Sequence, residues 1–351
     1  MDEQSGNPKT GHPLFRRHRG SFRRRPVYGA IDLGTNNCRL LIALPRRGGI
    51  KVIDSFSRIV RLGEGLAETG RLGEAAVART IEALAICRSK LEKRGAGRIR
   101  CIATAACREA TNRADFIAYV KRETGLEVEI ISAREEAGLA VCSCEALLKP
   151  TPRNALVFDI GGGSTEVIWA ERQASGEATI KGWVSVPRGV ITLAERFNAG
   201  EVDEALYAAM IEDVSGDLRA FEAEHGLARL IAEQGVQVVG TSGTVTTLAG
   251  LHLGLARYDR GRIDGLYMTT ADFQAACQRV LRTPVAERGQ LPCVGPERAD
   301  MMIAGCAILE SLCRMWPFAG LTVADRGLRE GLLLGMMVAD SGRRQSRKRW
   351  R

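Results

Sequence analysis

Residues 155–170 read ALVFDIGGGSTEVIWA, which is an apolar run, a turn with three glycines, and a second apolar run. Each apolar run has the length and composition of a buried strand. Three glycines in a row lose much conformational entropy on folding, which is reasonable where a ligand must approach the backbone amides. A strand rather than a helix is predicted after the turn, so this is not a Rossmann dinucleotide turn. The stretch predicts a β-hairpin whose turn binds an anion such as phosphate.

The same scheme occurs a second time at residues 27–43, which read VYGAIDLGTNNCRLLIA. Both stretches have an apolar run, an aspartate, an apolar residue and a glycine, followed by small polar residues and another apolar run. The two aspartates, Asp32 and Asp159, lie 127 residues apart. This internal repeat predicts two related domains that face each other across a cleft. Taken alone, the first turn is also compatible with a plain hairpin.

The segments around the repeats alternate predicted strands and helices, which indicates an α/β fold. Residues 149–154, KPTPRN, interrupt this alternation and predict a hinge. We therefore expect a first domain at 27–150 and a second domain at 151–340. Apolar residues make up 45% of the chain and charged residues 26%, as in soluble globular proteins. No uncharged apolar stretch is long enough to predict a membrane span.

The net charge of +9 is concentrated at the two ends of the chain. Residues 1–26 carry seven Lys or Arg and two Asp or Glu, and residues 341–351 carry six Lys or Arg and no acid. Both ends are too polar to build a core, so we expect disordered basic tails, either simply solvated or acting as an arm that gathers a polyanion. No nucleic-acid-binding motif accompanies them, and no secretory signal is recognisable. We expect a cytoplasmic protein with no specific nucleic-acid partner and no membrane attachment.

Several polar groups are candidates for chemistry. Asp159 and Glu166 flank the glycine turn and supply the oxygen ligands that Mg²⁺ prefers. Residues 240–245, GTSGTV, follow an apolar strand and open a predicted helix, whose N-terminus favours an anion but is equally compatible with a structural cap. Glu135 and Glu136 begin another helix, where acids are commonly partners of the helix dipole. If one of them faces the cleft, it can orient and deprotonate a water molecule.

Six segments together resemble the exopolyphosphatase and guanosine pentaphosphate phosphatase (Ppx/GppA) family. They are YGAIDLGTNNCRLLI, IATAACREATN, EIISAREEAGLA, VFDIGGGSTEV, GTSGTVTTLAG and ADRGLREGLL, in this order between about residues 27 and 340. The resemblance implies two duplicated ribonuclease-H-like domains, as in the actin, sugar kinase and acetate kinase superfamily. It also implies Mg²⁺ as the cofactor and a homodimer.

The resemblance further implies roles for individual residues. Glu136 is implied as the catalytic base that activates the attacking water, and Asp159 and Glu166 as the carboxylates associated with Mg²⁺. The implied phosphate-binding residues come from the two turns and from one arginine beside the cleft: Asp32, Gly34, Thr35, Asn36, Arg39, Arg108, Gly161, Gly162, Gly163, Ser164 and Thr165. Ser242 stands where the family frequently has glycine, which would narrow the pocket there.

The implied activity is that of an exopolyphosphatase, which releases orthophosphate from the ends of polyphosphate with Mg²⁺. The alternative is hydrolysis of guanosine pentaphosphate to guanosine tetraphosphate, and one protein can have both activities. A kinase-like ATP phosphotransferase and a non-catalytic actin-like scaffold are further alternatives. Longer family members append a C-terminal helical domain for which this chain is too short, so the resemblance does not extend to the grip on long polyphosphate that this region supports.

Overall fold

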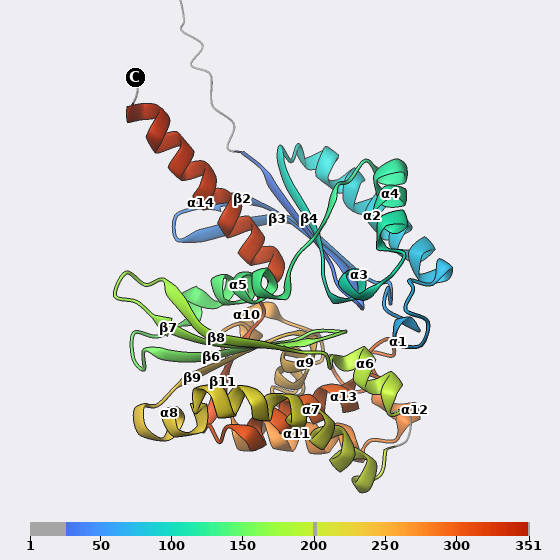
Figure 1. Ribbon diagram of the computed structural model, residues 1–351, viewed down its shortest axis with the longest axis vertical. Coiled ribbons are helices and arrows are strands. Elements are labelled where there is room, and N and C mark those ends of the chain that lie inside the picture. The colour runs from blue at the N-terminus through green and yellow to red at the C-terminus, as the bar shows by residue number, and fades with distance from the viewer. Residues whose placement is uncertain (1–25, 199–201, 350–351) are drawn as a thin grey trace, which may run out of the picture.

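The computed structural model describes residues 26–198 and 202–349, with side chains up to Ser341. It contains two mixed β-sheets in separate layers, with helices on their outer faces and two helices between them (Figure 1). Of the two predicted basic tails, residues 1–25 and 350–351 lie outside the described residues. No helix among the described residues is both long and apolar enough to cross a membrane.

The first sheet has the strand order β3-β2-β1-β4-β5. The pairs β1–β2 and β2–β3 are antiparallel, whereas β1–β4 and β4–β5 are parallel. Its strands are β1 (Tyr28–Leu33), β2 (Asn37–Arg46), β3 (Gly49–Ile59), β4 (Arg98–Ala103) and β5 (Val128–Ile130). The accompanying helices are α1 (Leu66–Thr69), α2 (Glu74–Arg94), α3 (Ala105–Glu109) and α4 (Arg113–Thr124). Buried residues of α2 and α4, such as Leu84 and Phe116, cover the outer face of this sheet.

The second sheet has the order β10-β11-β9-β6-β7-β8. Its strands are β6 (Asn154–Ile160), β7 (Thr165–Arg172), β8 (Ala178–Val186), β9 (Gln237–Thr241), β10 (Tyr267–Thr269) and β11 (Gly320–Ala324). The order β8-β7-β6-β9-β11 repeats that of the first sheet with the same parallel and antiparallel pairs, and β10 extends the edge. The duplicated α/β fold predicted from the sequence is thereby confirmed.

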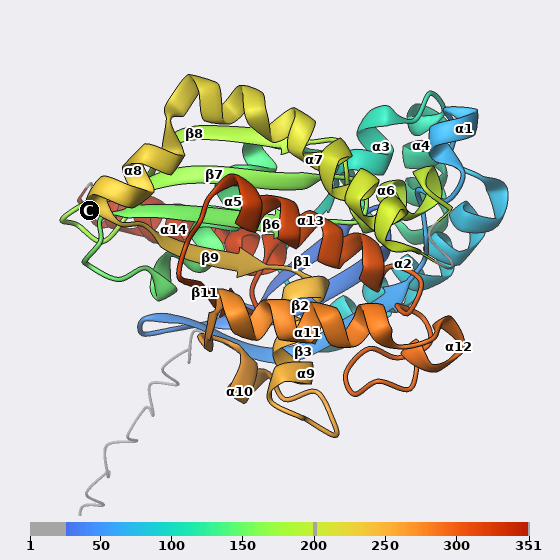
Figure 2. The same ribbon diagram turned by 90° about the horizontal axis from the view of Figure 1, so that it is seen from below.

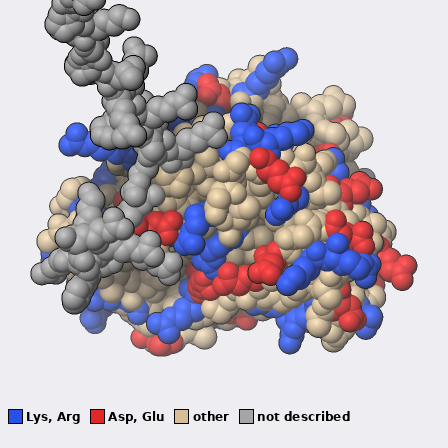
Figure 3. Space-filling model, turned by 90° about the horizontal axis from the view of Figure 1, so that it is seen from above, with Lys and Arg blue, Asp and Glu red and all other residues tan. Residues whose placement is uncertain are grey.

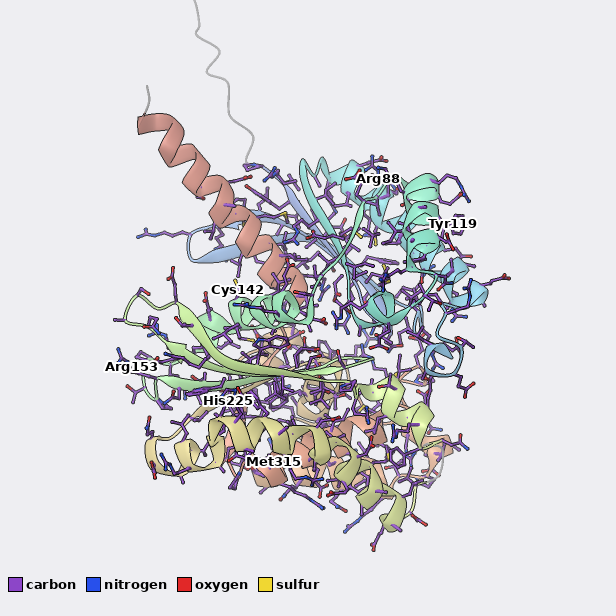
Figure 4. All side chains as sticks on the ribbon, viewed as in Figure 1. Arg88, Tyr119, Cys142, Arg153, His225 and Met315 are labelled. Atoms are coloured by element: carbon purple, nitrogen blue, oxygen red, sulfur yellow. The ribbon has the colours of Figure 1, made fainter. Side chains whose placement is uncertain are left out.

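Helices α7, α11 and α13 cover the outer face of the second sheet (Figure 2). The helices of this half are α6 (Val190–Arg196), α7 (Glu204–His225), α8 (Leu227–Gln234), α9 (Gly243–His252), α10 (Arg260–Ile263), α11 (Thr270–Arg282), α12 (Val285–Arg288) and α13 (Met302–Met315). His225 lies at the end of α7 (Figure 4). Its ring contacts Phe221 with centroids 4.6 Å apart and Trp169 of β7 with centroids 5.8 Å apart. Ring contacts of this kind attach the outer helices to the sheet.

The two halves of the chain exchange a helix. α5 (Ala133–Cys144) follows the first sheet but packs on β6, β7 and β8, whereas α14 (Leu328–Arg349) follows the second sheet but packs on β1, β2 and β3. The two helices also pack on each other between the layers (Figure 1). Their apolar side chains join both sheets in one cluster, which includes Ala137, Val157 and Leu332. The predicted domain boundary therefore separates the two repeats along the sequence, but one hydrophobic cluster contains residues from both sides of it. The short 3₁₀ helix η1 (Glu145–Leu147) ends α5.

The structure differs from the sequence prediction at the C-terminal end. α14 continues to Arg349, although a disordered tail was predicted from Ser341 onward. The Ser341 hydroxyl donates a hydrogen bond to the Met337 carbonyl at 2.8 Å. Arginine, lysine and glutamine, which dominate the following residues, have high helix propensity. A polar composition prevents a segment from forming part of a hydrophobic core, but it does not prevent the segment from forming a helix.

The described surface carries charges of both signs. Figure 3 shows Lys and Arg interspersed with Asp and Glu on the face seen from above, without a large region of one sign. This distribution agrees with the sequence, in which the excess of positive charge belongs to the two ends of the chain. A strongly basic field on this face is therefore not a property of the folded part.

Candidate active site

The turns of the two repeated hairpins touch each other. A Cβ placed on Gly162 would lie 3.1 Å from the backbone N of Asn36, and one placed on Gly163 would lie 2.6 Å from Thr35 Oγ1. Such an approach is open to glycine, which has no side chain, and not to larger residues. The first turn is thus part of a shared site and not an isolated hairpin.

A cleft of about 680 Å³ runs along this contact. The predicted site residues that line it are Asp32, Gly34, Thr35, Asn36, Arg39, Glu136, Asp159, Gly161, Gly162, Gly163, Ser164 and Glu166. Thr165 and Arg108 are not among the lining residues. The Thr165 hydroxyl donates a hydrogen bond to the Arg188 carbonyl at 2.7 Å, so it braces β7 and not a ligand.

The first turn of α5 places one of its two glutamates in the cleft. Ser132 caps the helix by accepting a hydrogen bond from the Glu135 N–H at 3.1 Å. Glu135 turns away from the cleft and pairs with Arg100 at 2.8 Å, whereas Glu136 lines the cleft and is 6% exposed. Successive residues of a helix point in different directions, so the packing of α5 selects Glu136.

Arg108 is the partner of Glu136 rather than part of the cleft wall. Its Nη1 donates a hydrogen bond to Glu136 Oε2 at 2.6 Å. Burial raises the pKa of Glu136 well above its usual range, and the nearby Glu166 and Asp159 raise it further while Arg108 opposes the rise. A raised pKa makes the ionised carboxylate a stronger base, which favours proton transfer from a water molecule.

The two hairpins place residues of opposite charge at the same position. Asp32 pairs in register with Arg39 across β1 and β2, and Asp159 pairs with Glu166 across β6 and β7. The aspartates therefore correspond to each other, and Arg39 corresponds to Glu166. Both hairpins therefore have an aspartate at this position. Its cross-strand partner is a cation in the first hairpin and a second acid in the second hairpin.

Burial governs the ionisation of these carboxyl groups. It raises the pKa of Asp159 to about 7, with Glu166 and Asp32 adding to the rise and Arg39 opposing it. Burial also raises the pKa of Asp32, against the effect of Arg39 and Arg329. At a given pH, a larger fraction of these cleft acids is therefore protonated than of exposed carboxyl groups.

This ionisation predicts a pH dependence of stability. The unfolded chain ionises Asp159 near pH 4 and the folded chain near pH 7, so the folded state binds more protons within this window. The free energy of unfolding therefore falls as the pH rises through it. In the presence of a chelator we expect a melting temperature about 2–4 °C higher at pH 6 than at pH 8, from about 1 kcal/mol. Asp159→Asn should weaken this dependence, and a melting temperature that rises from pH 6 to pH 8 would contradict it.

The chemistry of these carboxylates is compatible with a Mg²⁺ ion that a phosphate ligand would help to hold. Asp32 Oδ1 is buried without a hydrogen-bond partner, and the charge of Asp32 is near enough to act on Asp159. Glu166 Oε1 already accepts hydrogen bonds from the Ser164 and Ser185 hydroxyls at 2.7 and 2.9 Å. Among the described residues, no cluster of three or more His, Cys, Asp or Glu forms a metal site. Mg²⁺ commonly takes only one or two carboxylates and completes its shell with water and phosphate oxygens.

Sequence reasoning missed three arginines of the cleft, Arg298, Arg326 and Arg329. Arg298 Nη1 and Arg39 Nη2 lie 3.8 and 3.9 Å from a Cβ placed on Gly243, so guanidinium groups of both halves meet at the start of α9. Ser242 caps α9 with a φ of 140°, a value that favours glycine, as its place in the motif indicated. Arg298 lies outside every quoted segment, whereas Arg329 belongs to ADRGLREGLL and had no assigned role.

Residues 41–339 match the model of the Ppx/GppA phosphatase family. The chain belongs to this family. As a Ppx/GppA phosphatase it is a hydrolase, and the resemblance carried by the six sequence segments is confirmed.

Relatives in the Ppx/GppA family cover most of the chain. Exopolyphosphatase 2 of Mycobacterium tuberculosis is 32% identical over 324 residues, which are 88% of this chain and 97% of that protein. Guanosine-5′-triphosphate,3′-diphosphate pyrophosphatase of Aeromonas salmonicida is 31% identical over 318 residues, which are 89% of this chain but 60% of that protein. The crystal structure of the Aquifex aeolicus Ppx/GppA family member has 30% identity and a TM-score of 0.73, covering 90% of this chain and 98% of that one.

Proposed function

We propose that the chain is a Mg²⁺-dependent exopolyphosphatase, which hydrolyses the terminal phosphoanhydride bond of polyphosphate and releases orthophosphate. The observation that carries this proposal is the placement of Glu136, a buried carboxylate of raised pKa, beside two anion-binding turns in one cleft. The similarity to exopolyphosphatase 2 over nearly the full length of that protein supports the choice of substrate.

In the proposed reaction, the terminal phosphate lies between the two turns, whose backbone N–H groups and Ser164 surround its oxygens. Glu136 orients a water molecule and takes its proton, and Arg108 fixes the carboxylate by its hydrogen bond. When bound, Mg²⁺ would neutralise charge on the phosphate oxygens, and Asp159 and Glu166 are the residues that would hold it, with Asp32 near Asp159. The difficulty of phosphoryl transfer is crowded negative charge, which these groups relieve.

A second candidate function is hydrolysis of guanosine pentaphosphate. The similarity to the Aeromonas salmonicida enzyme favours it, although the match leaves out a large part of that protein. The cleft also extends to Tyr258, which is 44% exposed. An exposed aromatic ring at this end is a surface on which a nucleobase can stack.

The test is phosphate release from polyphosphate, guanosine pentaphosphate and ATP, each with Mg²⁺ and with chelator. We expect kcat/KM for polyphosphate to exceed that for guanosine pentaphosphate about tenfold or more, which corresponds to about 1.4 kcal/mol. Chelator should abolish release and added Mg²⁺ should restore it. A reversed preference would favour the second function, phosphate transfer from ATP to an acceptor would favour a kinase, and no release from any substrate would favour a scaffold.

A further inference from the structure

The duplication relates Arg329 to Glu136. Helix α5 follows the last strand of the first sheet, and α14 follows the equivalent strand β11 of the second. Near their N-terminal ends the two helices contain Glu136-Ala137-Gly138-Leu139 and Arg329-Glu330-Gly331-Leu332, and alignment on the shared Gly-Leu pair relates Glu136 to Arg329. The helices cross where a Cβ on Gly331 would overlap the Leu139 carbonyl. The glutamate and the arginine thus lie near the N-terminal ends of two helices of the duplicated halves, and both line the same cleft.

Their electrostatic neighbours correspond as well. The acids that raise the pKa of Glu136 are Glu166 and Asp159 of the second hairpin. The charges that act on Arg329 include Arg39 and Asp32, which hold the same two positions in the first hairpin. Two of the three positions thus carry opposite charges in the two halves, Glu136 against Arg329 and Glu166 against Arg39, whereas the aspartate is common to both.

Arg329 has no carboxylate partner. No ion pair within 4.0 Å joins it to any acid of the described residues, whereas Arg326 pairs with Asp264 at 2.9 Å. The neighbouring Glu330 is engaged elsewhere, because it accepts hydrogen bonds from Arg260 and from the Gly327 N–H. Burial lowers the pKa of Arg329, the nearby carboxylates of Glu330 and Asp32 oppose this shift, and the like charge of Arg39 adds to it. A buried cation that no carboxylate contacts directly gains stability when an anion binds to it.

We propose that Arg329 is a catalytic residue that binds the leaving group, the phosphate next to the scissile bond. This assignment rests on the proposed function. The water oxygen forms the new bond to the terminal phosphorus, and its proton passes to Glu136. The bond from phosphorus to the bridging oxygen breaks, and its electron pair stays on that oxygen of the shortened polyphosphate, where Arg329 donates hydrogen bonds. Because attack is in line, the base and the leaving-group cation belong on opposite sides of the phosphorus, and Glu136 and Arg329 reach the cleft from two different helices.

The test measures binding without turnover, in Glu136→Gln protein. Calorimetric titration with tripolyphosphate and with orthophosphate compares this parent with the double variant that also carries Arg329→Gln. We expect Arg329→Gln to weaken tripolyphosphate binding about 30–100-fold and to change orthophosphate binding less than about threefold. In otherwise wild-type protein, Arg329→Gln should lower kcat for polyphosphate by about 10²-fold or more, and Arg329→Lys should recover part of the loss.

Stability separates a binding role from a structural one. Removal of an unpaired cation should leave the melting temperature of the ligand-free protein unchanged or raise it, whereas loss of a structural arginine would lower it. The matched control is Arg98→Gln, which removes a cation that pairs with Asp340 of α14 at 3.0 Å and does not line the cleft. This variant should bind tripolyphosphate like the parent.

Three results would overturn the assignment. Equal tripolyphosphate binding with and without Arg329→Gln would remove its role while leaving the proposed function intact. Parallel weakening of both ligands would assign Arg329 to the terminal phosphate instead of the leaving group. A parent that binds no tripolyphosphate would refute the proposed function itself, and the leaving-group assignment with it.

Discussion

Glu136→Gln should lower kcat for phosphate release by about 10²–10⁴-fold, the usual contribution of a general base. The amide cannot accept the proton of the attacking water, although it has nearly the same shape as the carboxylate. Folding should survive, because burial, Glu166 and Asp159 all disfavour the charge that the substitution removes. The amide oxygen can still accept the hydrogen bond from Arg108. The measurement is kcat at saturating substrate together with the melting temperature.

Glu135→Gln is the matched control for this experiment. Its side chain lies one residue away on the same helical turn but is paired with Arg100 outside the cleft. We expect kcat within about twofold of wild type, because an exposed ion pair contributes little to stability and nothing to the chemistry. A Glu136→Gln protein that keeps its kcat, or a Glu135→Gln protein that loses it, would contradict the choice between the two glutamates.

Gly189→Ala should reduce kcat/KM about 100-fold or more by displacing the second turn, since small misplacements of catalytic groups can have effects of this size. Gly189 precedes α6 with an extended backbone, φ −114° and ψ −179°, that any residue can adopt. A side chain does not fit at this position, because its Cβ would overlap the backbone of Gly162 and lie 2.5 Å from the Gly163 N. The backbone that must shift belongs to the anion-binding turn, which also accepts hydrogen bonds from the Val190 and Ile191 N–H groups.

The overlap should also destabilise the protein by about 1–3 kcal/mol, as overpacking does. Gly138→Ala is the control, because a Cβ at that position of α5 meets no atom within 4 Å although it lies near Glu136. That change should leave kcat/KM unaltered and stabilise the helix by up to about 1 kcal/mol. Wild-type kinetics in Gly189→Ala would show that the second turn tolerates the displacement and would contradict its role in holding phosphate.

The sequence by itself determined the two hairpins, the turns between their strands and the duplicated α/β order. Strand and helix periodicities, together with the glycines between apolar runs, act between near neighbours in the chain and can be recognised without coordinates. The match between Asp32 and Asp159 likewise needed only the repeat. The polar C-terminal segment shows the limit of such reasoning, because α14 extends into it.

Only the tertiary structure decided which charges meet. The choice of Glu136 over Glu135 depends on which face of α5 packs on the second sheet, and the pairing of Arg108 with Glu136 joins residues 28 positions apart. The entry of Arg329 into the cleft depends on the exchange of helices between the halves, whereas the close fit of Gly189 against the second turn depends on packing within the second half. The direction in which a side chain leaves a helix depends on its position in that helix. Which residues it then contacts depends on the packing of segments that are distant in the sequence.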